Sequence, residues 1–368
     1  MRKIILLVIT LYTLSINSQI NNGDNNIYKT DTIKSKNVKI IAIPIVFTTP
    51  ETGFGIGGGA QFFLLNKSNI YNSRLSNILV SAIYTFNQQI MIDVNPKIYL
   101  KNGDYFLDAS YKLEIFPNSF WGIGSNTKEE DVESYNMTSN SLNVSLLKRL
   151  PPNLNFGFQF TYQNHDITER ELGGKLEKFI IPGSKGATIV GLGSVFNFDN
   201  RDNVADPKKG HFLGLSAQFS SKNFGATHNF NKFITDLRAY MPINENSTLA
   251  TQIYIETNYG NVPFQSKALY GGSNRARGYF RGRFIDNHSY VVQAEYRWRF
   301  HHRWGLAFFG LIGEVADQPK NFLSNLKPSL GGGIRFKITK NQNTLLRLGM
   351  AKGKDDNGGL YFGVNQAF

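Results

Sequence analysis

The sequence contains no cysteine among its 368 residues. This absence excludes a disulfide framework, a lipid anchor attached through cysteine and metal sites with thiolate ligands. Long hydrophobic runs are almost as scarce, because the apolar stretch Ile4–Leu14 is far below the ~20 residues that a membrane-spanning helix needs. The pattern also predicts no amphipathic helix longer than about two turns, which disfavours a helical domain.

The N-terminal residues predict a secretory signal peptide at residues 1–18, because Arg2 and Lys3 precede the apolar stretch. Residues 19–38 are polar and rich in Asn and Lys, so we expect a flexible periplasmic tail. Residues 39–368 show no change of composition that would mark a linker, and we expect one domain there. An exported chain without disulfides suits the bacterial envelope.

Basic residues outnumber acidic ones, with 40 Lys and Arg against 27 Asp and Glu, for a formal net charge of +13. This excess first suggests nucleic acid, but the basic residues are spread over turns and strands and no nucleic-acid-binding motif is present. We therefore expect anionic lipid and lipopolysaccharide, and no nucleic acid, as partners.

Catalytic and metal sites are poorly supported. Gly53, Gly55 and Gly57 lie in an expected hairpin without a following helix, which favours close strand packing over a phosphate loop. His301 and His302 are adjacent on a turn, where a solvated basic turn is favoured over a zinc site. No nucleophile motif has a base placed beside it. We predict no enzymatic activity, no cofactor and no metal.

What the sequence does contain is alternation. From Tyr290 to Phe300 the even-numbered residues are apolar, whereas the odd-numbered ones include Gln293, Glu295 and Arg297. A period of two indicates a strand with one apolar and one polar face. Charged groups on one face and large aromatics on the other suit a barrel with lipid outside and water inside.

Sixteen segments carry this kind of pattern, and an even number is what a closed antiparallel membrane barrel requires. We therefore predict an all-β, transmembrane antiparallel barrel. The candidate strands lie at residues 39–49, 54–65, 76–87, 89–100, 104–114, 141–150, 154–165, 187–198, 211–221, 229–241, 247–259, 289–300, 304–314, 330–339, 344–352 and 359–368.

The connections between these segments alternate in length. Short turns are typical of the periplasmic side of such barrels, and long loops of the outside. The tight turns lie at Gly103, 151–153, 244–246 and 301–303, and the long connections near 115–140, 166–186 and 260–288.

The longest of these connections holds four arginines, Arg275, Arg277, Arg281 and Arg283, between the eleventh and twelfth strands. A guanidinium has five donors and keeps its charge in proteins. The segment must therefore lie in water, on a polyanion or in a polar cavity, and the two placements outside and inside the lumen stay open.

Two motifs resemble the BamA/TamA superfamily of outer-membrane barrels, the bacterial surface antigen domain. Leu269-Tyr-Gly-Gly followed by Arg277, Gly278 and Tyr279 is similar to that family's sixth-loop signature. A second motif is similar to the family's turn between two barrel strands, and a third resembles the C-terminal insertion signal of outer-membrane barrels. The turn residues are Asp199, Arg201, Asp202, Pro207 and Gly210, and the signal residues are Phe362, Val364 and Phe368.

The resemblance implies that the sixth loop folds into the lumen, where Arg277 pairs with acidic residues on neighbouring strands. Glu295 takes the acceptor position, and its parity independently points it inward. The next strand departs from the family, because Leu311 stands where many members carry Asp. Glu314 is a substitute only if a bulge reverses its parity.

The resemblance further implies an integral barrel of the bacterial outer membrane that acts in outer-membrane protein assembly or polypeptide translocation. About twenty residues precede the first strand, so we expect a member without POTRA domains. Expected partners are the barrel-assembly machinery, unfolded client proteins and a periplasmic subunit. A passive channel or structural barrel that has lost insertase activity is the alternative.

Overall fold

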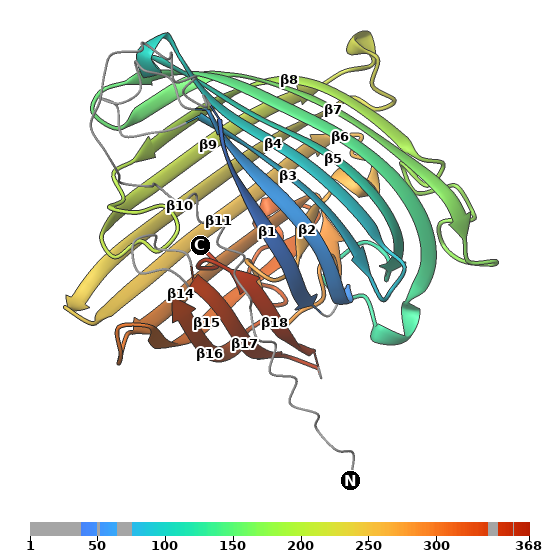
Figure 1. Cartoon of the computed structure of the whole chain (residues 1–368). Helices are drawn as coiled ribbons and strands as arrows, with labels where there is room; N and C mark the ends of the chain where they lie inside the picture. Colours follow the sequence, from blue (N-terminus) through green and yellow to red (C-terminus); the bar gives the residue numbers. More distant parts are fainter. Residues whose placement is uncertain (1–37, 50–51, 65–75, 338–344, 356) are drawn as a thin grey trace, which may run out of the picture. The chain divides into compact units, whose positions relative to one another are not determined.

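The alternating segments form one antiparallel sheet of sixteen strands, each bonded to its neighbours in chain order, and a separate hairpin of two short strands, β12 and β13 (Figure 1). The strands are β1 (Val38–Thr49), β2 (Gly53–Leu64), β3 (Ser76–Thr85), β4 (Ile90–Leu100), β5 (Tyr105–Phe120), β6 (Glu133–Leu150), β7 (Leu154–Arg170), β8 (Ala187–Asp199), β9 (Gly210–Ser220), β10 (Phe230–Asn244), β11 (Ser247–Gly260), β12 (Ala268–Tyr270), β13 (Phe284–Asp286), β14 (His288–Trp298), β15 (Trp304–Ala316), β16 (Ser329–Lys337), β17 (Leu345–Gly353) and β18 (Gly358–Val364). Single turns of 3₁₀ helix occur at η2 (Lys101–Gly103), η3 (Glu129–Asp131), η4 (Lys222–Phe224), η5 (Phe264–Ser266) and η6 (Pro319–Asn321).

The computed structural model describes residues 38–49, 52–64, 76–337, 345–355 and 357–368. The predicted signal peptide and all but the last residue of the predicted tail lie outside the described residues. Within the described ranges, no helix has the length and apolar character that a membrane crossing requires.

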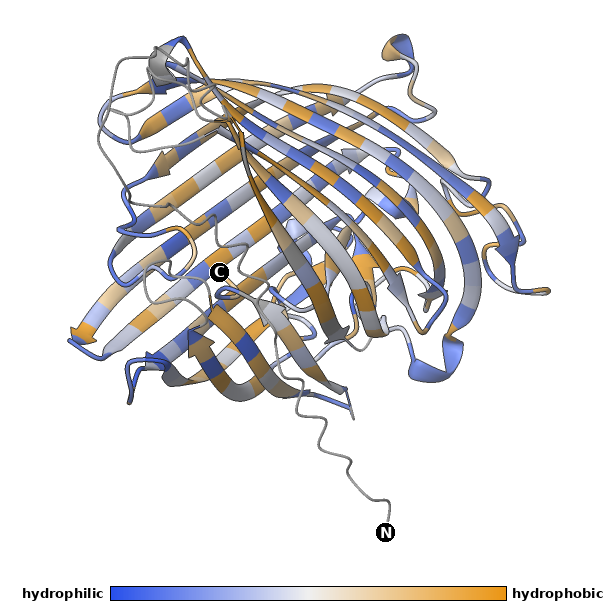
Figure 2. Cartoon of the chain, in the orientation of Figure 1, coloured by the Kyte–Doolittle hydropathy of each residue, from blue (hydrophilic) through white to orange (hydrophobic). Residues whose placement is uncertain are grey.

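The polar side chains line the inside of the sheet, the reverse of a water-soluble fold. On β14, Gln293, Glu295 and Arg297 are buried, whereas Val292 and Trp298 are exposed on the other face. The same alternation of hydrophilic and hydrophobic residues runs along the other strands (Figure 2). An apolar outer surface of this kind is stable in lipid, and the polar inner surface is stable in water.

The first and last strands of the sheet lie side by side, but no backbone ladder joins them among the described residues. The curved sheet brings β1 alongside β18, with Cα atoms within 8 Å of each other (Figure 1). Every other neighbouring pair has a defined register, but among the described residues none joins β1 to β18. The two strands also differ in length, at 12 and 7 residues.

Several connections at one end of the sheet are tight, although ten residues join β8 to β9 there, and those at the other end are mostly longer. The turns at 151–153 and 245–246 belong to the short-turn end. The connection 261–287 lies at the opposite, long-loop end, where it is the sixth in chain order after those that follow β1, β3, β5, β7 and β9. The predicted position of the arginine-rich loop is therefore confirmed.

Four predicted strand boundaries differ from the structure by four residues or more, and one of them is the end of the strand predicted at 154–165, which continues to Arg170. The segment 115–140 is mostly strand, because the β5–β6 ladder continues out to the pair Phe120 and Glu133. Polar residues such as Asn118 and Asn136 break the alternation there without breaking the backbone ladder. The last strand ends at Val364 and not at residue 368, because Asn365 has a φ of +62° and turns the chain away.

The two faces of β10 offer a test of this architecture. Leu237, at the middle of the strand, is exposed on the outer face, whereas Ile234 faces the lumen opposite Glu256. We expect Leu237→Arg to destabilise the barrel in lipid by about 2–4 kcal/mol, and Ile234→Arg by less than about 1 kcal/mol, because only the first charge enters hydrocarbon. Each variant is folded into vesicles and titrated with denaturant, and the folded fraction is read from its heat-modifiable mobility on a gel. Equal losses of stability in the two variants would contradict the assigned faces.

Candidate functional site

The sixth loop folds back against the inner wall of the barrel. Its two short strands, β12 and β13, pair through Leu269 and Ile285. Tyr270 and Tyr279 are completely buried and their rings lie 5.3 Å apart. They share a hydrophobic cluster with Phe309 of β15 and other wall residues. The second placement left open by the sequence, inside the lumen, is the one that the structure shows.

The backbone at the tip of the loop positions Arg277. Ala276 and Gly278, on either side, have φ angles of +52° and +103°. A side chain at Gly278 would place its Cβ 2.3 Å from the Ser329 Oγ, so only glycine fits. The Gly278 amide donates a hydrogen bond of 2.8 Å to the Tyr361 hydroxyl of β18. We call Arg277, Gly278 and Tyr279 the hook.

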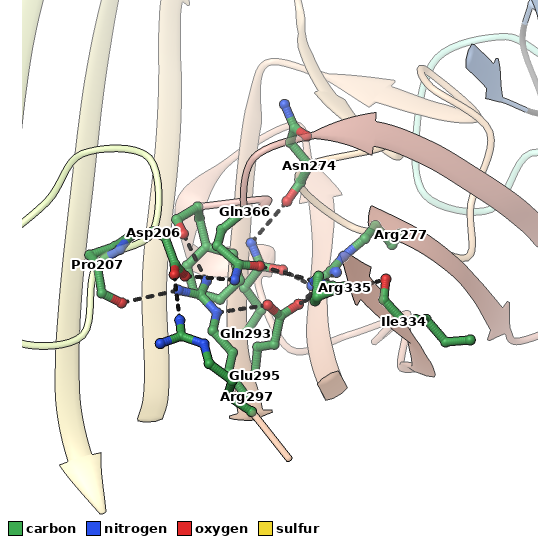
Figure 3. Close-up of polar contacts among 12 residues, drawn as sticks. Asp206, Pro207, Asn274, Arg277, Gln293, Glu295, Arg297, Ile334, Arg335 and Gln366 are labelled. Carbon is green, nitrogen blue, oxygen red and sulfur yellow. Dashed lines mark hydrogen bonds and ion pairs between the residues drawn. The ribbon is translucent and has the colours of Figure 1, made fainter. Parts of the chain in front are cut away.

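Arg277 pairs with Glu295, as the strand parity predicts (Figure 3). Its Nη1 donates to Glu295 Oε2 at 2.8 Å, and its Nη2 reaches Gln293 Oε1 at 3.5 Å. The Phe309 ring lies 3.4 Å from the guanidinium carbon and covers its face. The side chains of Arg277 and Glu295 are 3% and 0% exposed, so the pair is shielded from solvent.

Glu295 also binds two further arginines. Arg297 Nε donates to its Oε1 at 2.9 Å, and Arg335 Nη2 lies 3.3 Å from its Oε2. Arg347 approaches from β17, where it stands directly opposite Arg335 in the ladder. It donates to the Asn274 side chain, while its Nε and Nη1 find no acceptor among the described residues. One carboxylate thus faces four guanidinium groups, and we call Glu295, these four arginines and the polar residues bonded to them the hook cluster.

The structure shows what Leu311 and Glu314 of β15 contact, where the sequence departs from the family. Leu311 is buried in the hydrophobic cluster and supplies no acceptor to the hook. Glu314 does not replace it. Its carboxylate is buried but accepts the backbone N–H groups of Leu323 and Asn325 in the next loop. Its outward parity is therefore kept, and it orders the seventh loop instead of the hook.

Other loops hold the sixth loop in place. Arg283 Nε donates to Glu129 at 2.7 Å and its Nη1 to Thr127, both in the third loop. From the seventh loop, Lys327 lies 4.3 Å from the Phe284 ring. Burial lowers the pKa of the Lys327 ammonium from its ordinary value. The arginine-rich segment is thus anchored at its stem as well as at the hook.

The turn that resembles the family signature is closed by its own residues. Arg201 binds both carboxylate oxygens of Asp199 at 2.8 Å. Asp202 accepts the backbone N–H groups of Lys208 and Lys209, and Gly210 has a φ of +104°. The Pro207 carbonyl accepts a bond of 3.5 Å from Arg297, which links this turn to the hook cluster.

The C-terminal residues divide between the two faces. Phe362 lies opposite Leu348 in the β17–β18 ladder on the outer face, and Val364 is the last strand residue. Phe368 instead lies in the interior with Tyr240, and its carbonyl accepts a 2.8 Å bond from Arg297. Phe362 and Phe368 of the predicted insertion signal therefore lie on opposite faces.

Several members of the hook cluster were missed by sequence reasoning. Gln366 joins Arg335 to Asp206 with bonds of 3.0 and 2.9 Å. Asp206 in turn binds Arg299 at 2.7 Å. Parity on β16 and β17 could have placed Arg335 and Arg347 inside, but no pattern joins Asp206 to Gln366 across 160 residues.

These features together define an outer-membrane β-barrel whose polar interior holds an inward-folded loop. The chain belongs to the Omp85 superfamily, whose domain model matches residues 85–368. The expected resemblance is thereby confirmed. A comparison with curated protein sequences finds no match.

Solved structures with the same fold include two kinds of protein. BamA from Haemophilus ducreyi lacking POTRA domains 1–3 aligns with a TM-score of 0.63 and 14% identity, over 89% of this chain and 70% of that one. CdiB from Acinetobacter baumannii aligns with a TM-score of 0.56 and 13% identity, over 90% and 60% of the two chains. CdiB from Escherichia coli gives 0.58 and 11%, over 90% and 62%. At these identities the likeness concerns the fold.

Neutralising Glu295 tests its role in the cluster. We expect Glu295→Gln to cost about 3–5 kcal/mol of stability, because it leaves buried arginines without a counter-charge. The loop-six arginines should then become accessible to trypsin. The control is Asp236→Asn, which removes a lumen carboxylate bound to the single arginine Arg238 at 2.6 Å and should cost about 1 kcal/mol. Similar costs, with the loop still resistant to trypsin, would argue against the assigned role.

Proposed function

We propose that this barrel lies in the bacterial outer membrane and assists the insertion or translocation of other polypeptides. The observation that carries this proposal is the junction between β1 and β18, which lie side by side without a described ladder. An unpaired strand edge presents a row of backbone donors and acceptors, and an incoming strand can pair with such an edge.

The last strand is suited to weak pairing. β18 has 7 residues, and Gly358, Gly359 and Gly363 are three of them. Glycine weakens a strand because its backbone loses more freedom on folding and it has no side chain to pack. The cost of opening the sheet is therefore lower at this junction than at a long ladder such as β5–β6, where sixteen residue pairs are in register.

The hook supports the same role from inside. The Gly278 amide binds Tyr361 of β18, and the Tyr279 hydroxyl donates to the Pro328 carbonyl at 2.7 Å and accepts from the Lys354 amide at 2.9 Å. Loop six thus contacts β18 and the residues that flank the ends of β16 and β17. In this proposal, β18 can separate from β1 while the wall behind it keeps its shape.

The proposal includes the partners and the mode of action. Unfolded outer-membrane proteins are the clients, a periplasmic subunit delivers them, and the assembly machinery inserts this barrel into lipid that contains lipopolysaccharide. The barrel acts by strand pairing, without catalysing a covalent reaction.

Crosslinking across the junction tests the proposal, because the chain has no native cysteine. Val46 of β1 and Leu360 of β18 are exposed on the outer face, and a Val46→Cys/Leu360→Cys pair closed by a short bismaleimide would lock the junction. We expect the lock to slow barrel-dependent folding of a client into vesicles at least tenfold. The control is Val46→Cys/Ile56→Cys, which links directly opposed residues within the β1–β2 hairpin and should leave the rate unchanged.

An equal rate in both crosslinked proteins would contradict insertion through this junction and favour the second candidate, a passive channel. The burial of Leu311 in place of a family carboxylate favours that candidate, since the hook then has fewer acceptors. For a channel, Arg277→Ala should leave a steady conductance in planar bilayers. For an insertase held by its hook, we expect the same variant to change the conductance level or add frequent gating.

A further inference from the structure

A cavity of about 280 Å³ opens at the short-turn end of the barrel. It lies between the turn at 200–209, the β10–β11 turn and the ends of β14 and β16. Arg297 and Arg335, both nine-tenths buried, line it on the inner side, and Figure 3 shows these two residues beside Glu295. The cavity therefore adjoins the hook cluster on the side away from the loops.

The cationic side chains that line this cavity exceed the carboxylates by seven to three. Two of the carboxylates are engaged, because Asp206 binds Arg299 and Gln366, and Asp202 accepts backbone N–H groups. Glu245 is the third. The lining alone thus carries a formal excess of four positive charges, although Arg297 and Arg335 also pair with Glu295, which lies behind it.

The cations at the rim are available to a ligand. Among the described residues, no carboxylate forms an ion pair with Lys208, Lys209, Arg303 or Lys337. Arg303 and Lys337 come from neighbouring strand ends, joined by a backbone bond of 2.8 Å from the Lys337 amide to the Arg303 carbonyl. Their side chains can therefore approach one bound group together.

The cluster behind the inner wall adds an independent observation. Arg347 is 7% exposed, and two of its guanidinium nitrogens have no acceptor among the described residues. Among the described residues, Glu295 is the one side-chain carboxylate that forms ion pairs with Arg277, Arg297 and Arg335, and none pairs with Arg347. Both the cavity and the wall behind it therefore carry uncompensated positive charge, and an anion in the cavity would lower the repulsion in both.

We propose that this cavity binds a phosphate-type oxyanion. Guanidinium forks match the geometry of phosphate oxygens, and lysine ammonium groups bind phosphate as point charges. Two sources carry this chemistry, free phosphate and the headgroup of an anionic phospholipid at the membrane surface. The inference holds whether or not the barrel inserts other proteins.

Isothermal titration calorimetry provides a direct readout of binding in this cavity. The full barrel in detergent is titrated with inorganic phosphate at constant ionic strength, with chloride as the balancing anion. We expect a saturable heat of binding in the wild type, and an apparent Kd at least tenfold higher in Arg303→Gln/Lys337→Gln. The control Lys128→Gln/Lys178→Gln removes the same charge from exposed positions in the third and fourth loops and should keep the wild-type Kd.

Titrations in nanodiscs of different lipid composition distinguish free phosphate from a lipid headgroup. If phosphatidylglycerol raises the Kd for free phosphate and phosphatidylcholine does not, the lipid headgroup occupies the site; equal values identify free phosphate. Either result supports the cavity as an oxyanion site. The proposal is overturned if the wild-type titration shows no saturation, or if both double variants lose affinity equally.

Discussion

The interior of this barrel depends on one buried carboxylate. Glu295 binds Arg277 of the sixth loop, Arg297 of its own strand and Arg335 of β16. Removing three guanidinium groups from water is expensive, and the expense is offset only where a counter-charge and hydrogen bonds are already in place. The loop can therefore fold inward because Glu295 lies within hydrogen-bond distance of Arg277. The strands can hold Arg297 and Arg335 nearby because the same carboxylate also pairs with them.

β18 is bonded to the hook on its inner side but has no described ladder to β1 at its edge. The hook binds β18 through the Tyr361 hydroxyl, whereas the outer edge of β18 has no described ladder to β1. A barrel in lipid normally removes its edges by closure, because unpaired backbone groups cost several kcal/mol each in hydrocarbon. β18 is therefore held by its ladder to β17 and by the hook inside the lumen, and not by a described ladder to β1.

The balance of charge inside the barrel differs between the sixth loop and the short-turn end. Around the sixth loop, arginines find acceptors such as Glu129 in the third loop. Near Glu295, Arg347 has two guanidinium nitrogens without an acceptor among the described residues. In the cavity at the short-turn end, the cationic side chains outnumber the carboxylates. The net charge of +13 thus has a local component inside the protein as well as a general one toward an anionic membrane.

Much of the fold follows from local pattern alone. A period of two places Val292 and Trp298 on one face and Glu295 on the other, because successive side chains of a strand point to opposite sides. The sixteen strands, the sixth-loop position and the Arg277–Glu295 pair could all be predicted on that basis, with the resemblance to a known family supplying the partner. The extension of β5 and β6 could not, since their outer ends keep the ladder while losing the alternation.

The sequence by itself determined which residues face lipid and which face water, because that choice is made residue by residue along each strand. Only the tertiary structure decided which inward groups meet. Arg335 of β16 reaches Glu295 of β14 over the one strand between them, and Gln366 reaches Asp206 in the distant β8–β9 turn. Phe368 enters the lumen because the backbone turns at Asn365. Such contacts depend on the curvature and register of the whole sheet, which no local period encodes.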